Sequence, residues 1–134
     1  MRYMLDTNTC IHIIKYRPGA LCDRLSSLSI EDVAISSIVT AELWYGVALS
    51  QKKKQNEAAL KDFFDYVEVV NWPSGAGPIY GQIRAHLKGV GTPIGAMDIL
   101  IAAHALFAGS VLVTDNTREF EGVQGLRTEN WLGR

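Results

Sequence analysis

The sequence predicts an α/β fold, a three-layer α/β/α sandwich with a central parallel β-sheet. Short strands rich in β-branched residues alternate with helical segments of ten or more residues, which is typical of a parallel sheet covered on both faces. The crossovers in such a sheet are expected to be right-handed. No repeat, low-complexity tract or linker interrupts the 134 residues. We therefore expect residues 1–134 to form a single domain.

The first half of the chain contains two strand-to-helix units. "RYMLD" is a short apolar strand that ends at an acid, and "NTCIHIIKY" after it has apolar residues at helical spacing. A proline-containing turn at residues 17–19 stops this helix. The pattern repeats at residues 33–50, where "VAIS" is a buried strand and Ser36 or Ser37 caps the next helix.

The second half continues the alternation. A polar helix is expected from about residue 51 to 66, followed by a third strand, "VEVVNW", that Pro73 closes. Two glycines lead into the helix "IYGQIRAHLKG". The turn "GVGTPIG" precedes "AMDILIAAHALFAG", which is apolar almost all round and is therefore expected to be a central buried helix. "SVLVTD" is the fourth strand.

The overall charge does not identify a partner. Thirteen basic and fourteen acidic side chains give a net charge of −1, so a polyanion has to be held by a local basic patch. The cations that are candidates for contact with a nucleic-acid backbone are Lys52, Lys53, Lys54, Arg84, Lys88 and Arg118. For the lysine run, a solvated face is the simpler interpretation.

The N-terminal segment and the cysteines indicate a cytoplasmic protein without a membrane partner. Asp6 interrupts the first apolar run before a signal peptide or a membrane span is complete. Cys10 and Cys22 lie in predicted helical segments without a metal-binding or paired pattern. They are expected to be free thiols in a reducing compartment.

Four acids are expected to meet at one edge of the sheet. Asp6 and Asp115 end the first and fourth predicted strands, where ligands bind in parallel sheets. Glu42 and Asp98 lie near the starts of helices that begin at the same edge. Each acid is the only charged residue in its segment, and a buried unpaired carboxylate costs several kcal/mol.

Simpler roles exist for three of these acids. Asp6 is suited to cap the first helix, Asp98 to lie in the first turn of a helix, and Asp115 to form a turn. Glu42 lies too deep in its helix for a cap and has no partner for a capping box. Together the four acids are better explained by one site than by four coincidences.

The carboxylate oxygens of these four acids favour Mg²⁺ or Mn²⁺ as the bound ion. Zinc is disfavoured because no His or Cys is among the four residues. A bound Mg²⁺ or Mn²⁺ ion activates water and neutralises charge at a phosphoryl group, so phosphodiester hydrolysis is the natural chemistry. Short polar residues next to the acids are candidates to orient carboxylates or phosphate, or to act only as caps and turns. They are Thr7, Asn8, Thr9, Thr114 and Asn116, with Arg118 close to the strand-four acid.

The motifs "MLDTNTCI", "SSIVTAELWYG", "GTPIGAMDILIAAHA" and "LVTDNTREFEGVQGLRTENW" resemble those of PIN-domain ribonucleases of the VapC type. The resemblance spans nearly the whole chain. It implies a PIN-like fold and a Mg²⁺- or Mn²⁺-dependent endoribonuclease toxin that cuts RNA, often tRNA, and inhibits translation. It also implies a homodimer and a cognate VapB-type antitoxin. Initiator tRNA is suggested by analogy with similar toxins.

The resemblance also assigns roles to individual residues. Asp6, Glu42 and Asp98 match the three acids of the family, and Asp6 and Asp98 match the usual metal ligands. At the fourth position, either Asp115 or Asn116 faces the metal. We assign Asp115 to the metal and Asn116 to a supporting role, and leave open whether one ion or two bind.

Two other enzyme or binding classes and a plain interaction protein fit the sequence less well. "DTNT" is similar to the nucleophile motif of haloacid-dehalogenase-like phosphatases, but Asn8 replaces the general acid. A non-catalytic receiver-like Mg²⁺-binding module should carry an acid at the end of its third strand, and this sequence has none there. A plain interaction protein would show no metal dependence.

The aromatic residues Trp44, Tyr45, Phe63 and Phe64 belong either to a dimer surface or to the core.

Overall fold

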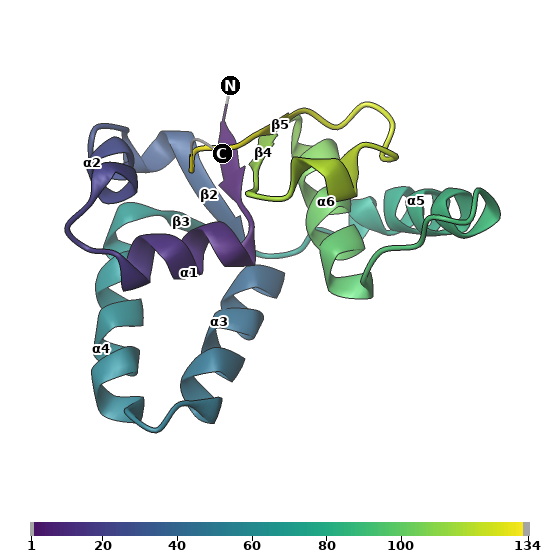
Figure 1. The fold of residues 1–134 in the computed structure, drawn as a ribbon. Coiled ribbons are helices and arrows are strands. Elements are labelled where there is room, and N and C mark those ends of the chain that lie inside the picture. The colour runs from purple at the N-terminus through teal and green to yellow at the C-terminus, as the bar shows by residue number, and fades with distance from the viewer. Residues whose placement is uncertain (1, 133–134) are drawn as a thin grey trace.

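The computed structural model describes residues 2–132, which form a five-stranded sheet with helices around it (Figure 1). The strand order is β3-β2-β1-β4-β5, and every neighbouring pair is parallel. The strands are β1 (Tyr3–Leu5), β2 (Val33–Ser36), β3 (Glu68–Val70), β4 (Val111–Val113) and β5 (Thr128–Glu129). The central parallel sheet is therefore confirmed, and β5 is a short strand that the sequence did not indicate.

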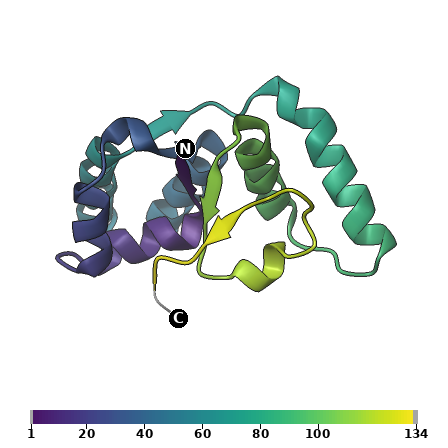
Figure 2. The ribbon, with the colours of Figure 1, turned by 90° about the horizontal axis from the view of Figure 1, so that it is seen from above.

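The α-helices are α1 (Thr7–Lys15), α2 (Ala20–Ser26), α3 (Ser37–Leu49), α4 (Lys53–Phe63), α5 (Gly77–Gly89) and α6 (Ala96–Ala108). Four short 3-10 helices join them: η1 (Ile30–Asp32), η2 (Phe64–Tyr66), η3 (Ser74–Ala76) and η4 (Thr117–Phe120). Helices α1 and α2 lie on one side of the sheet and α5 and α6 on the other, while α3 and α4 extend as a pair beyond the strands (Figures 1 and 2).

Helix α6 is the central buried helix that its apolar sequence predicts. Residues 101–105 are all buried, and Gly109, in a left-handed conformation at φ 66°, ends the helix. The indole Nε1 of Trp72, in the segment after β3, donates to the carbonyl of Leu100 at 2.8 Å. This hydrogen bond joins α6 to the segment after β3 two residues beyond Asp98.

The four aromatic side chains of α3, α4 and η2 that the sequence singles out divide between core and surface. Phe63 is buried and Phe64 is half-buried, so these two contribute to the core. Tyr45 is 66 % exposed and Trp44 is 37 % exposed. The exposed apolar face of α3 is completed by Leu49, which is also 66 % exposed.

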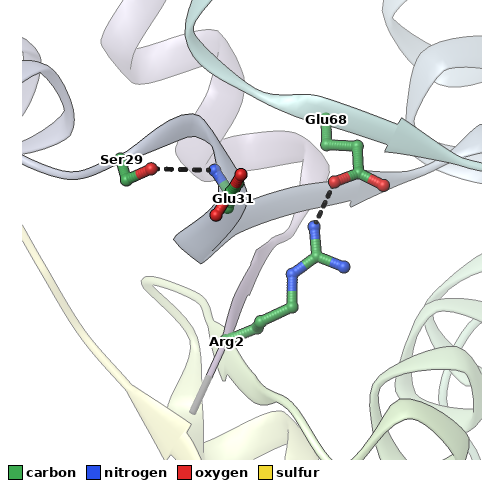
Figure 3. A network of polar contacts seen from close by, with 4 residues as sticks. All are labelled: Arg2, Ser29, Glu31 and Glu68. Carbon is green, nitrogen blue, oxygen red and sulfur yellow. Dashed lines mark hydrogen bonds and ion pairs between the residues drawn. The ribbon is translucent and has the colours of Figure 1, made fainter.

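The edge of the sheet at the strand N-termini is held by a surface ion pair. Nη2 of Arg2, just before β1, lies 2.9 Å from Oε2 of Glu68 at the start of β3, so the side chain reaches past β2 (Figure 3). In the same view, the Ser29 hydroxyl accepts from the backbone N–H of Glu31 at 3.3 Å and caps η1. Exposed pairs of this kind contribute about 1 kcal/mol or less. All four candidate acids lie away from this edge.

Both cysteines are free, as expected; Cys10 is buried and Cys22 is half-buried. No helix within residues 2–132 has the length and apolar character needed to cross a bilayer.

Candidate functional site

Asp6 lies where β1 ends and α1 begins. Its Oδ1 accepts from the backbone N–H of Thr9 at 2.9 Å, so it is the N-cap of α1. Its own backbone N–H donates to the carbonyl of Val113 at 3.0 Å, which joins it to the end of β4. The side chain is only 6 % exposed. Asp6 therefore caps α1 and also lies at the carboxyl edge of the sheet, as both interpretations of the sequence expected.

The surroundings of Asp6 favour its neutral form. Burial is the largest cause of its raised pKa, and the nearby charge of Asp115 acts in the same direction. Hydrogen bonds from Thr114 and Thr9 oppose the shift. Within residues 2–132, neither Asp6 nor Asp115 forms an ion pair with Lys, Arg or His.

Glu42 faces the same junction from α3. Ser36 caps this helix by accepting from the backbone N–H of Ile38 at 3.1 Å. Two turns further along, the half-buried Glu42 accepts from the hydroxyl of Thr7 at 2.6 Å through its Oε1. Thr7 follows Asp6 directly, so Glu42 lies at the same strand end as Asp6.

Asp98 lies in the first turn of α6 and is paired with another acid, Glu119. Partial burial, followed by the hydrogen bond and the charge of Glu119, raises the pKa of Asp98 to about 6. Two carboxyl groups that share a proton in this way resist ionising together. Glu119 is a site residue that the sequence analysis did not identify.

Asn116 holds Glu119 in place. Its Oδ1 accepts from the backbone N–H of Glu119 at 3.4 Å, and its Nδ2 donates to Oε2 of Glu119 at 3.2 Å. Asn116 therefore caps η4 and positions a carboxylate, while Asp115 is the residue beside Asp6. In the sequence, the spacing of "NTRE", with a capping residue three positions before a glutamate, is the signal from which Glu119 could have been identified.

The smaller polar residues divide into buried and exposed sets. Thr114 is buried; besides its bond to Asp6, its hydroxyl accepts from the backbone N–H of Asn116 at 3.1 Å. Thr9, also buried, donates to the carbonyl of Val113 at 3.3 Å. Asn8 and Arg118 are exposed. The two buried threonines therefore orient Asp6 from the protein interior, whereas Asn8 and Arg118 are accessible to a ligand.

Side-chain interactions and adjacency in the chain link the acids into a series, which we call the acid string. Within residues 2–132, none of these acids is in an ion pair with Lys, Arg or His, and no three acidic, His or Cys side chains are close enough to hold a metal as they stand. The donor set is made of carboxylate oxygens, which suits a hard divalent cation. The acid string consists of Glu42 bonded to Thr7, of Asp6 beside Asp115, and of Glu119 in contact with Asn116 and Asp98, while Thr7 follows Asp6 and Asn116 follows Asp115 in the chain.

The carboxyl pair gives the first prediction. In metal-free protein, Glu119→Gln should lower the pKa of Asp98 below its value of about 6, because the substitution removes the charge of Glu119. NMR titration of the Asp98 carboxyl carbon measures this shift. Glu121→Gln, an exposed residue of the same loop, is the matched control. An unchanged Asp98 titration in Glu119→Gln would show that the two carboxyl groups are not paired.

Comparison with known proteins shows which family the chain matches. The family model described as "PIN domain" matches residues 3–126. The chain is 43% identical over 131 residues to the "tRNA(fMet)-specific endonuclease VapC" of Shigella flexneri, with 98% of each chain covered. It is 42% identical over 132 residues to "Ribonuclease VapC2" of Rickettsia felis, again with 98% of each chain covered.

A solved structure shares the fold over nearly the whole chain. "Crystal structure of VapBC2 from Rickettsia felis bound to a DNA fragment from their promoter" contains a chain with a TM-score of 0.92 and 41% identity, covering 98% of this chain and 99% of that one. This similarity confirms the expected three-layer α/β/α arrangement.

Proposed function

The chain belongs to the PIN-domain family and, within it, to the VapC ribonucleases, and from this membership we propose that it is an endoribonuclease toxin that hydrolyses RNA phosphodiester bonds. The observation that carries the proposal is the string of acids at the carboxyl edge of the sheet, without cationic partners within residues 2–132. Neither a phosphatase nor a receiver-like module accounts for both the similarity and this string of acids.

Nucleases of the PIN-domain family depend on a divalent metal, and the ion we propose for this chain is Mg²⁺, with Mn²⁺ as a substitute. The ligands we propose are Asp6 and Asp98, with Glu42 and Asp115 completing the anionic set. When bound, the ion polarises the phosphate and lowers the pKa of water. The absence of Lys and Arg partners on these acids, within residues 2–132, supports this assignment.

The residues themselves have separate roles in this proposal. Thr7 fixes the carboxylate of Glu42 with a 2.6 Å hydrogen bond, so that the acid enters the site in one orientation. The pair of Asp98 and Glu119 binds a proton with a pKa of about 6 at Asp98, close to neutral pH. A bound cation would favour the ionised form of Asp98 and displace this proton. Asn116 keeps Glu119 beside Asp98.

The substrate we propose is tRNA, with initiator tRNA as the first candidate, because a relative 43% identical to the chain is named a tRNA(fMet)-specific endonuclease. We propose that cleavage of this substrate takes place in the cytoplasm and inhibits translation. Purified protein is to be incubated with total RNA in Mg²⁺, with and without EDTA, and the fragment ends mapped. A single cut site in one tRNA, absent with EDTA, is the expected result. Uncut RNA, or cutting unaffected by EDTA, would contradict the proposal.

We further propose that a VapB-type antitoxin binds the groove between α1, α3 and α4. This groove has a volume of about 440 Å³. Its apolar wall suits a hydrophobic segment of a partner, and the presence of Glu42 in its lining brings that partner to the acid string. The residues that line it include Ile11, Ile14, Glu42, Leu43, Gly46, Val47 and Leu60.

Filling this groove should separate binding of the antitoxin from cleavage of RNA. A Cβ atom at Gly46 meets nothing within 4 Å, so Gly46→Phe places a ring in the groove without a clash of its Cβ. We expect at least a tenfold loss of affinity for the coexpressed product of the neighbouring gene, with unchanged RNA cleavage. Ala58→Phe, on the exposed part of α4, is the control. Equal binding by both variants, measured by calorimetry, would rule out the groove.

A homodimer is proposed through the exposed apolar face of α3. Tyr45 and Leu49 are each 66 % exposed, which is unusual for two large apolar side chains of one helix. Tyr45→Ser/Leu49→Ser is expected to convert a dimer into a monomer in sedimentation equilibrium. Val90→Ser/Met97→Ser, a pair of comparably exposed residues elsewhere, should leave the dimer intact. A wild-type monomer, or a dimer that survives the α3 change, would contradict the proposal.

A further inference from the structure

Two hollows adjoin on the α5 side of the molecule, at the Glu119 end of the acid string. One has a volume of about 300 Å³ and the other about 340 Å³, and both are lined by Leu87, Pro93 and Ile94. Helix α5 runs along the outside of α6, and the segment that follows it returns to the start of α6 (Figure 2). The two hollows therefore form one surface depression between α5, this returning segment and η4, which we call the α5 cleft.

The α5 cleft opens beside the candidate site. Glu119, the partner of Asp98, lines one hollow, and Ile99, which follows Asp98 in the chain, lines the other. An extended ligand in the cleft therefore passes next to the carboxyl pair. A ligand that is cut at the acids has to extend beyond them, and the cleft provides a path.

Three cations line the cleft. Arg84 and Lys88, one turn apart on α5, line the first hollow, which has no acid in its lining. Arg118 of η4 lines the second hollow together with Glu119 and Glu121. All three cations are exposed. Within residues 2–132, none of the three forms an ion pair with a carboxylate. Their charges are therefore available to an anionic ligand.

The Arg84 side chain is held in place by a neutral neighbour. Its Nη1 donates to the hydroxyl of Tyr80 at 2.6 Å, and its Cζ lies 5.9 Å from the centroid of the tyrosine ring. This arrangement orders the guanidinium group without neutralising it, so less side-chain entropy is lost when it binds an anion. The lysine run at residues 52–54, in contrast, is exposed at the start of α4, and none of its residues lines the cleft.

We propose that the α5 cleft binds the backbone phosphates of the RNA strand adjacent to the bond that is cut, through Arg84, Lys88 and Arg118. The inference rests on the proposed ribonuclease function and extends it to the path of the substrate. The net charge of −1 and the acid string repel a polyanion, so binding requires local cations next to the acids. The cleft places three such cations there.

Phosphate contacts have a measurable signature. For single strands, each neutralised phosphate contributes about 0.7 to the slope of log K against log salt concentration. Removing two cations that contact phosphates should therefore lower this slope by about 1.4. Removing two cations that do not contact the strand should leave it unchanged.

The test compares two double variants with the same change of charge. Arg84→Gln/Lys88→Gln alters the cleft, and Lys53→Gln/Lys54→Gln alters the lysine run on α4. Binding of a fluorescent single-stranded RNA that spans the mapped cut site is measured by anisotropy in EDTA over a range of salt concentrations. Cleavage kinetics are measured in Mg²⁺ with the same RNA, and circular dichroism verifies that both variants are folded.

We expect the cleft variant to bind RNA at least tenfold more weakly at low salt, to lose about 1.4 from the salt slope, and to show a raised KM with unchanged kcat. The lysine-run variant should match the wild type in all three. The inference is overturned if the wild type cuts RNA and the two variants behave alike. If the wild type neither binds nor cuts RNA, the proposed function fails, and the inference fails with it.

Discussion

Replacing Asp98 by asparagine is expected to lower RNA cleavage at least about 100-fold and to make the protein more stable at neutral pH. The activity should fall because the amide removes one proposed anionic metal ligand and one member of the carboxyl pair. The stability rises because the pKa of Asp98 is raised from 3.8 to about 6, first by burial and then by Glu119. The folded state then binds a proton more tightly than the unfolded state, so the carboxyl group stabilises the fold most at low pH. This stabilisation is lost as the pH rises through 6.

The Asp98→Asn experiment needs a control of the same chemistry. Asp62→Asn changes an exposed acid of α4 in the same way and should affect neither cleavage nor stability. Urea midpoints at pH 7 and pH 4 measure the stability difference between Asp98→Asn and wild type, which should be larger at pH 7. If Asp98→Asn cuts RNA at the wild-type rate, Asp98 is not part of the active site.

Millimolar Mg²⁺ is expected to raise the melting temperature of the wild-type protein substantially. A ligand that binds only the folded state stabilises it by about 2.7 kcal/mol at one hundred times its dissociation constant. For a chain of this size, the corresponding shift in melting temperature is on the order of 10 °C. The gain arises because a cation offsets the repulsion between acids that, within residues 2–132, have no Lys or Arg partner.

Two controls separate this effect from general screening. NaCl at matched ionic strength tests for screening of surface charges, and it should not reproduce the shift. Asp6→Asn should reduce the Mg²⁺ shift, because this residue is a proposed ligand. A melting temperature that is the same in Mg²⁺, Mn²⁺ and EDTA would contradict a bound metal.

Much of the fold follows from local sequence patterns. The apolar segments before Asp6 and around Ile35 and Leu112 are buried strands because they have no polar face to present to water. The apolar character of α6 predicts its central position for the same reason. Strand β5 was not predictable in this way, since Thr128 and Glu129 are polar and become a strand only by pairing with β4.

In the candidate site too, some residues could be predicted from local sequence and others depend on tertiary contacts. Strand ends and isolated charges identified Asp6 and Asp115, and the structure makes them neighbours. Glu119 was missed because it lies in "TREFE", where a second acid and an arginine make it look like an ordinary surface residue. Its role depends on tertiary contacts with Asn116 and Asp98. The α5 cleft likewise depends on the packing of η4 against the segment after α5.

The most direct test of the central claim is a titration with Mn²⁺ followed by electron paramagnetic resonance. The claim is that carboxylates from distant segments hold one divalent metal site at the carboxyl edge of the sheet. We expect the wild type and Asp62→Asn to bind Mn²⁺ equally, and Asp6→Asn and Asp98→Asn each to bind it at least tenfold more weakly. Equal binding by all four proteins, or no binding by the wild type, would contradict the claim.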